Sequence, residues 1–281
     1  MRVLVTGTSG RVGRGVLEGL LAENAPVRAL SRQPEKAGLP REAEVVRGDL
    51  GEPAGLAKAF DGVRAVFLYA QGGKLPELMD EMKRAGVEYV VFLSTIDATN
   101  THGYAQHNRR RHLEIEEAIA AAGFKYTFLR PGAFATNALR FWRQSIVDSG
   151  VVRIPFPESQ QSPIDERDIS AVAVRALLSR KLDAEAIVLT GPESLTQRQQ
   201  IQSLSEVLAR PISVTTISED EARQQLQKNL SPPYVELLIA QWREEVGVLS
   251  PVTPNVERVL GRPATNYRTW VRRNADSFNA A

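Results

Sequence analysis

The sequence lacks cysteine and contains only three histidines among its 281 residues. Without cysteine the chain can form no disulfide, thiolate nucleophile, cysteine zinc site or iron–sulfur cluster. This composition fits a reducing compartment, so we expect a cytoplasmic protein. The histidines stand at positions 102, 107 and 112. Residues spaced by five point about 140° apart on a helix, whereas aligned ligands are spaced by three or four, so we expect no metal site.

The sequence also has no large excess of charge of one sign and no long apolar run. The 35 basic and 33 acidic residues leave a net charge of +2, which gives no reason to expect nucleic acid as a partner. No apolar run approaches the ~18 residues of a membrane span, and the N-terminus lacks the regions of a signal peptide. We therefore expect a monomer or homodimer whose partner is a small molecule, with neither nucleic acid nor membrane involved.

Short apolar runs alternate with helical patterns from residue 2 to residue 190. The apolar runs fall at 2–6, 27–30, 44–46, 65–69, 89–94, 125–129 and 186–190, and the helical patterns at 12–21, 74–85, 105–122 and 165–180. This alternation predicts βαβ units around a parallel sheet.

The predicted fold class is α/β, a Rossmann-type doubly wound parallel sheet with a smaller, mostly helical C-terminal cap. We expect the Rossmann domain over residues 1–131, completed by about 164–190. The cap is expected over 132–163 and 191–281, where prolines interrupt the helical pattern.

A glycine-rich turn over residues 7–13 reads G-x-x-G-x-x-G between the first apolar run and the first helical pattern. Glycines allow a tight turn and a close approach of the backbone to a pyrophosphate. The N–H groups of the helix N-terminus then face the negative charge. The residues expected to bind the dinucleotide in this turn are Gly7, Ser9, Gly10, Arg11, Val12 and Gly13.

The stretch 28–33 decides the expected cofactor type. An NAD site carries an acidic residue about 20 residues after the turn, but this stretch contains none. Arg32, with Ser31 beside it, suits a 2′-phosphate, so we expect NADP(H) in preference to NAD(H). Arg32 as a plain surface residue is the alternative. Asp49 and Leu50 are expected at the adenine, where the alternative for Asp49 is a helix N-cap before residues 53–60.

These residues, with others downstream, resemble the NmrA-like group of atypical short-chain dehydrogenases/reductases, near its quinone-oxidoreductase and azoreductase-like members. The resemblance covers nearly the full chain. It rests on the turn at 7–13, on Arg32, and on the segments 93–95, 114–117, 126–132, 164–169, 189–193 and 261–264. It implies a Rossmann-type domain, NADP binding and, in many members, reduction of quinones or other carbonyl-type acceptors. The further residues expected at the cofactor are Ala70, Gln71, Ser94, Thr95, Pro131, Gly132 and Phe134.

The usual catalytic pair of short-chain dehydrogenases is broken in this sequence. The pair is Tyr-x-x-x-Lys, but Tyr104 is followed four residues later by Asn108. The candidate catalytic residues are therefore Tyr104, His112 and Ser94. His112 takes the place of a lysine of some NmrA-like members and titrates near neutral pH. Ser94 at a strand end would polarise a substrate oxygen. Each has a purely structural alternative: a packed aromatic, a surface histidine and a turn residue.

Aromatic residues after position 131 suggest the wall of a pocket for a flat acceptor. The residues expected to line it are Phe134, Asn137, Phe141, Trp142, Tyr234 and Trp242. Core packing is the alternative for each aromatic residue.

Together these features predict an NADPH-dependent oxidoreductase that transfers hydride to a quinone, conjugated or other carbonyl-type small molecule, an apolar or aromatic acceptor. Loss of the Tyr/Lys pair favours acceptors that need little help from a protein acid. The alternatives are a non-catalytic NADP(H)-binding redox sensor and a non-redox cyclase or isomerase on the same fold.

Overall fold

The computed structural model describes residues 1–281 except 70–72, 100–102, 104–105 and 280–281. Its main feature is a seven-stranded sheet in the order β3-β2-β1-β4-β5-β6-β9, in which every neighbouring pair is parallel. The strands are β1 (Arg2–Val5), β2 (Val27–Ser31), β3 (Glu44–Arg47), β4 (Val63–Leu68), β5 (Tyr89–Leu93), β6 (Lys125–Pro131) and β9 (Glu185–Leu189). The predicted Rossmann-type sheet is confirmed.

Helices cover both faces of this sheet. One apolar cluster joins it to α1 (Arg11–Ala22), α7 (Glu166–Ser179) and α11 (Asn255–Leu260), and a second joins it to α2 (Ala57–Phe60), α3 (Leu75–Arg84) and α4 (Gln106–Ala121). In β5 every residue is buried, and Val91 and Phe92 belong to opposite clusters. A central parallel strand covered on both faces has this apolar character.

The direction of strand order reverses between β1 and β4, which lie next to each other although β2 and β3 intervene in sequence. In open α/β sheets the crevice outside the carboxyl ends of the strands at such a reversal is the place where ligands bind. The turn at 7–13 follows β1 directly and therefore stands at this position.

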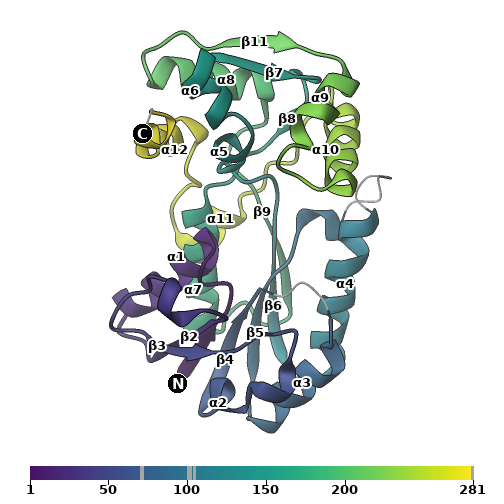
Figure 1. The fold of residues 1–281 in the computed structure, drawn as a ribbon. Helices are drawn as coiled ribbons and strands as arrows, with labels where there is room; N and C mark the ends of the chain where they lie inside the picture. Colours follow the sequence, from purple (N-terminus) through teal and green to yellow (C-terminus); the bar gives the residue numbers. More distant parts are fainter. Residues whose placement is uncertain (70–72, 100–102, 104–105, 280–281) are drawn as a thin grey trace.

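The cap lies beyond the carboxyl ends of the strands (Figure 1). Its helices are α5 (Asn137–Phe141), α6 (Arg143–Ser149), α8 (Gln197–Val207), α9 (Glu219–Leu226), α10 (Pro232–Glu244) and α12 (Tyr267–Arg273). Two small sheets tie its pieces together: β7 (Val151–Ile154) pairs with β11 (Ser213–Thr216), and β8 (Gln160–Gln161) pairs with β10 (Leu195–Thr196). Trp142 and Trp270 are buried in its core. Among the described residues, no helix has both the length and the apolar character needed to cross a membrane.

Candidate functional site

The turn between β1 and α1 is built for close approach to a ligand. Gly7 has φ +66°, in the left-handed region that favours glycine. A Cβ on Gly13 would lie 2.3 Å from the Gly7 carbonyl oxygen, so only glycine fits at position 13. Gly10 caps α1 and offers no side chain to the first turn of the helix. Within the described chain the N–H groups of residues 11–13 have no hydrogen-bond acceptor, which leaves them for an anion.

Two buried threonines fix this turn to the strands on either side. Thr8 Oγ1 donates to the Leu30 carbonyl oxygen on β2 at 3.2 Å. Thr6 Oγ1 donates to the Phe67 carbonyl oxygen at 3.0 Å and accepts the Tyr69 N–H at 2.7 Å. The turn is therefore held in one conformation before any ligand arrives, which lowers the entropic cost of binding.

The residues predicted for the ribose and adenine lie at the carboxyl ends of β2 and β3. Arg32 is exposed, and its guanidinium has no hydrogen-bond or ionic partner among the described residues. Ser31 Oγ accepts the Gln33 N–H at 3.2 Å. Asp49 Oδ1 accepts the Gly51 N–H at 2.9 Å, and the expected helix 53–60 is divided into the 3₁₀ turn η2 (Pro53–Gly55) and α2.

Arg11 lies at the start of α1 with 56% of its side chain exposed, 3.7 Å from Glu166 on α7. Glu166 is buried and also accepts the indole N–H of Trp270 at 3.0 Å. Ser9 is exposed at the same end of α1, whereas Val12 is buried beneath it. Ala70 and Gln71 lie outside the described residues.

A cavity of about 330 Å³ opens between the sheet and the cap. It is bordered by the segments that follow β5, β6 and β9 and, across from them, by the end of α10 and the loop after it. Its lining residues are Ile96, Asp97, Thr99, Gly132, Ala133, Gln160, Gln161, Thr190, Gln241, Glu244, Glu245, Val248, Leu249, Ser250 and Pro251. We refer to it below as the cap cavity.

The Glu245 carboxyl accepts three side-chain hydrogen bonds at the edge of the cap cavity. Its Oε2 accepts hydrogen bonds from Ser159 Oγ at 2.9 Å and Gln161 Nε2 at 3.2 Å, and its Oε1 accepts one from Gln241 Nε2 at 2.7 Å. Burial disfavours the charged form and raises the pKa of this carboxyl from 4.5 to about 7, although the three hydrogen bonds act in the opposite direction. Asp97 raises it further.

His112 lies on α4 against β5, outside the lining of the cap cavity. It is 8% exposed, and its ring stands 6.1 Å from that of Phe92. Nδ1 is 2.9 Å from the Asn108 carbonyl oxygen. Because a carbonyl only accepts, Nδ1 carries the proton in this contact, and Nε2 of the neutral ring is an acceptor. Burial lowers the pKa of His112 below its ordinary value, which favours this neutral form.

The Ser94 hydroxyl is hydrogen-bonded to a buried ion pair, Glu116 with Arg130. The hydroxyl donates to Glu116 Oε1 at 2.6 Å, and the same oxygen accepts Arg130 Nε at 3.0 Å. Thr95 Oγ1 accepts the Asp97 N–H at 3.2 Å, at the start of the 3₁₀ turn η3 (Ile96–Thr99). Tyr104 lies outside the described residues. Asn108, at the position of the missing lysine, donates to Asp97 Oδ2 at 2.6 Å.

The chain after β6 passes from the sheet to the cap. Pro131 is buried, and the Gly132 N–H bonds to the Leu189 carbonyl oxygen at 2.9 Å. Phe134 pairs with Ile164 in an isolated parallel bridge and packs on the sheet core. Gly132 thus borders the cap cavity, while Phe134 does not.

The other residues predicted for the substrate lie in the cap, on α5, just after it, or on α10. The rings of Phe141 and Trp242 meet edge to face at 5.7 Å. Arg140 lies 4.9 Å over the Tyr234 ring. Trp142 and Trp242 are 5% and 4% exposed, and Asn137 begins α5. None of these five predicted residues lines the cap cavity: Asn137, Phe141, Trp142, Tyr234 and Trp242.

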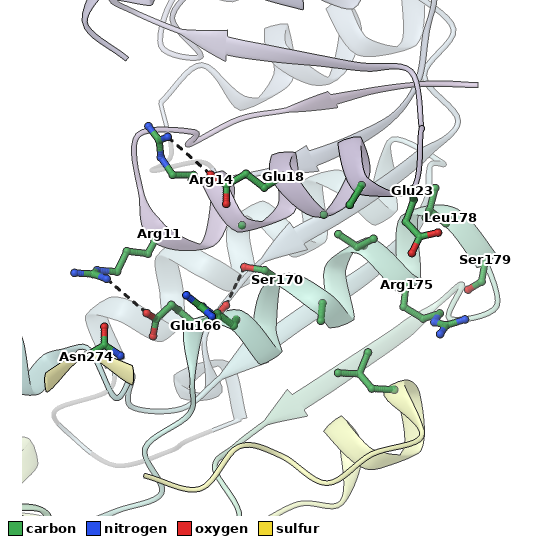
Figure 2. A pocket seen from close by; sticks show the side chains of 17 residues that line it. Arg11, Arg14, Glu18, Glu23, Glu166, Ser170, Arg175, Leu178, Ser179 and Asn274 are labelled. Carbon is green, nitrogen blue, oxygen red and sulfur yellow. Dashed lines mark hydrogen bonds and ion pairs between the residues drawn. The ribbon is translucent and has the colours of Figure 1, made fainter. Parts of the chain in front are cut away.

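A larger groove of about 900 Å³ runs along the outer side of α1 and α7 (Figure 2). Its floor is the close contact of the two helices: a Cβ on Gly15 would lie 2.5 Å from Ser170 Oγ, and one on Gly19 would lie 2.8 Å from Val174. Figure 2 shows charged side chains along its edges, including Arg14 with Glu18. The groove follows from helix packing, whereas the cap cavity adjoins the strand ends, so we assign the site to the cap cavity and the turn.

The fold and the turn together define a Rossmann-type dinucleotide-binding protein. Residues 7–180 match the NAD(P)H-binding family. A (4-alkanoyl-5-oxo-2,5-dihydrofuran-3-yl)methyl phosphate reductase from Streptomyces griseus is 36% identical over 281 residues, covering 98% of this chain and 99% of the relative. An NAD(P)H azoreductase from Xenophilus azovorans is 31% identical over 292 residues, covering 99% and 100%.

The chain therefore belongs to the NAD(P)H-binding family, and it is an oxidoreductase related to these two reductases. The resemblance found in the sequence is confirmed. An NADPH-dependent quinone oxidoreductase from Escherichia coli, solved with NADPH, has the same fold with a TM-score of 0.80 at 22% identity, over 97% of this chain and 99% of that chain.

Sequence reasoning missed Glu245. Nothing in the run Gln241–Glu245 marks it as different from the other glutamates of the cap. It is half-buried because β8, more than 80 residues earlier, crosses the end of α10. The Ser159–Val246 bridge fixes that crossing. A signal of this kind exists only in three dimensions.

Proposed function

We propose that the protein is an NADPH-dependent reductase of conjugated carbonyl compounds, including quinones. The single observation that carries the proposal is that the cap cavity and the nucleotide turn share one edge of the sheet. Gly132, which is expected at the cofactor, and Ala133 beside it line the cavity. When bound, the cofactor supplies a hydride to the acceptor. The compartment we propose is the cytoplasm.

The turn fits the cofactor because its glycines leave room and its unpaired N–H groups favour a pyrophosphate. Arg32, exposed and unpaired at the end of β2, would bind a 2′-phosphate, and this supports NADPH in preference to NADH. The residues that would hold the rest of the nucleotide are Ser9, Arg11, Asp49 and Leu50.

The cap cavity fits an apolar acceptor with one polar edge. Val248 and Leu249, in the loop after α10, line it with 55% and 75% of their surfaces exposed. They give the cavity an apolar wall. Ile96 and Pro251 extend that wall, while Gln161 and Gln241 supply donors. Excluding water from this space strengthens the polar contacts within it.

The choice of a conjugated acceptor has two supports. The Tyr/Lys pair is absent, since Asn108 occupies the lysine position and is bonded to Asp97. The reductase from Streptomyces griseus is named for a dihydrofuran whose ring double bond is conjugated with a ring carbonyl and an alkanoyl group. Conjugation delocalises the negative charge that develops during reduction, so less help from a strong protein acid is needed.

The test is NADPH oxidation with three acceptors: 1,4-naphthoquinone, 2-cyclohexenone and cyclohexanone. We expect turnover of the first two and little of the third. Tight NADPH binding with no turnover of any acceptor would overturn the proposal and favour the redox-sensor alternative. Equal turnover of cyclohexanone would overturn the preference for conjugation.

A further inference from the structure

Two carboxyls at the end of α10 line the cap cavity, and one of them, Glu245, has an unusual setting. All three donors to Glu245, from Ser159, Gln161 and Gln241, are neutral. A carboxylate placed for structural reasons at a cavity edge usually pairs with a cation. Among the described residues, no lysine, arginine or histidine lines this cavity.

One charged neighbour, Asp97, also favours the neutral form of Glu245. Asp97, on η3, faces it across the cavity, and Glu244 lines the same space. Arg243, the neighbouring cation on α10, is ion-paired with Glu219 at the opposite side of the helix. The negative end of the α10 dipole adds a further unfavourable field for a carboxylate. Glu245 therefore keeps its proton up to about pH 7 at the edge of the cavity expected to hold the acceptor.

Building on the proposed function, we propose that Glu245 is the proton donor of the reduction, a role expected from the sequence for Tyr104 or His112. As hydride arrives at the β-carbon, the conjugated electrons shift to the carbonyl oxygen. The Glu245 O–H bond breaks, and a new O–H bond forms on the acceptor. Glu245 then regains a proton from solvent, so each turnover consumes one NADPH and one H⁺.

Ser159 is the positioning residue in this arrangement. It is fully buried, and its hydroxyl bonds to Glu245 Oε2. Removing that donor takes away a bond that favours the charged form, so Ser159→Ala raises the pKa of Glu245 further. A purely structural Glu245 would leave the pH dependence of turnover unaffected by this change.

The experiment compares wild type, Glu245→Gln, Ser159→Ala and the control Glu257→Gln with 1,4-naphthoquinone under saturating NADPH, across the neutral pH range. Glu257 lies on α11, exposed and outside the cap cavity. For wild type and the control we expect kcat to fall about tenfold per pH unit above about pH 7. Glu245→Gln should lose about 100-fold in kcat at neutral pH, together with this dependence. Ser159→Ala should move the fall to higher pH.

A readout independent of turnover is the ¹³C signal of the glutamate side chains in the cofactor-free protein. We expect one carboxyl to titrate near neutral pH in wild type and to be absent from Glu245→Gln. If wild type turns over the acceptor and Glu245→Gln has the same kcat and the same pH profile, this inference is overturned. The proposed function would still stand. No wild-type turnover with any acceptor would overturn the proposed function itself. If Glu245→Gln does not fold, an unmoved profile in Ser159→Ala still refutes the proton-donor role.

Discussion

Burial of Glu245 makes the stability of the folded chain depend on pH, and Glu245→Gln removes that dependence. The carboxyl has an ordinary pKa of 4.5 and a folded-state pKa of about 7. Between these values the folded chain keeps a proton that the unfolded chain has released. Stability therefore falls as pH rises through this window, and the full penalty is present above about pH 7. Below about pH 4.5 both states are protonated and no penalty remains.

The magnitude follows from the width of the window. One pKa unit corresponds to about 1.4 kcal/mol, so the full penalty is about 3 kcal/mol. Glu245 is only half-buried, and cavity water screens the charge, so this is an upper value. Between about pH 5 and about pH 8 the penalty grows by about 2.5 kcal/mol.

Urea unfolding of wild type, Glu245→Gln and Glu257→Gln at a series of pH values measures this quantity. We subtract the free energy of unfolding of wild type from that of Glu245→Gln. This difference should increase by about 2 kcal/mol from about pH 5 to about pH 8, because only wild type loses stability in this range. Lost hydrogen bonds change this difference by a constant, and all other titrating groups cancel. Glu257→Gln, with the same change of charge on an exposed residue, should track wild type. A difference that stays constant with pH would refute the reasoning.

Three further changes test the rest of the site. Gly13→Ala puts a methyl group 2.3 Å from the Gly7 carbonyl oxygen. It should cost about 1–3 kcal/mol in urea unfolding and abolish NADPH binding. Gly55→Ala, with no described atom within 4 Å of its Cβ, serves as control. Arg32→Ala should weaken NADPH binding at least about tenfold in a fluorescence titration with little effect on NADH; equal losses for both cofactors would contradict the 2′-phosphate assignment. Arg130→Met leaves Glu116, which is 4% exposed, without its cation, and should cost about 3 kcal/mol in unfolding; a change below about 1 kcal/mol would show that the pair is not effectively buried.

The position of the glycine turn between a strand and a helix was predictable because its determinants are local. The turn at 7–13 lies between a strand and a helix that immediately adjoin it, so spacing alone fixes how glycines and N–H groups meet a ligand. The strands of the sheet were predictable for the same reason: runs such as 89–94 are apolar on both faces. The aromatic residues of the cap were different, because an aromatic side chain suits a core and a pocket equally. Phe141 and Trp242 meet each other, and no local pattern distinguishes that from lining a cavity.

The contrast between His112 and Glu245 shows why the proton-donor question needs the fold. By residue type, histidine is the natural donor near neutral pH and glutamate is an ordinary base. Burial acts in opposite directions on the two groups, because it disfavours a cation on the imidazole and an anion on the carboxyl. His112, buried on α4, is thereby kept neutral, with Nδ1–H committed to the Asn108 carbonyl oxygen. Glu245, which lies against β8 and near Asp97, thereby keeps its proton up to about pH 7. The same desolvation that leaves His112 with an acceptor nitrogen leaves Glu245 with a proton to donate.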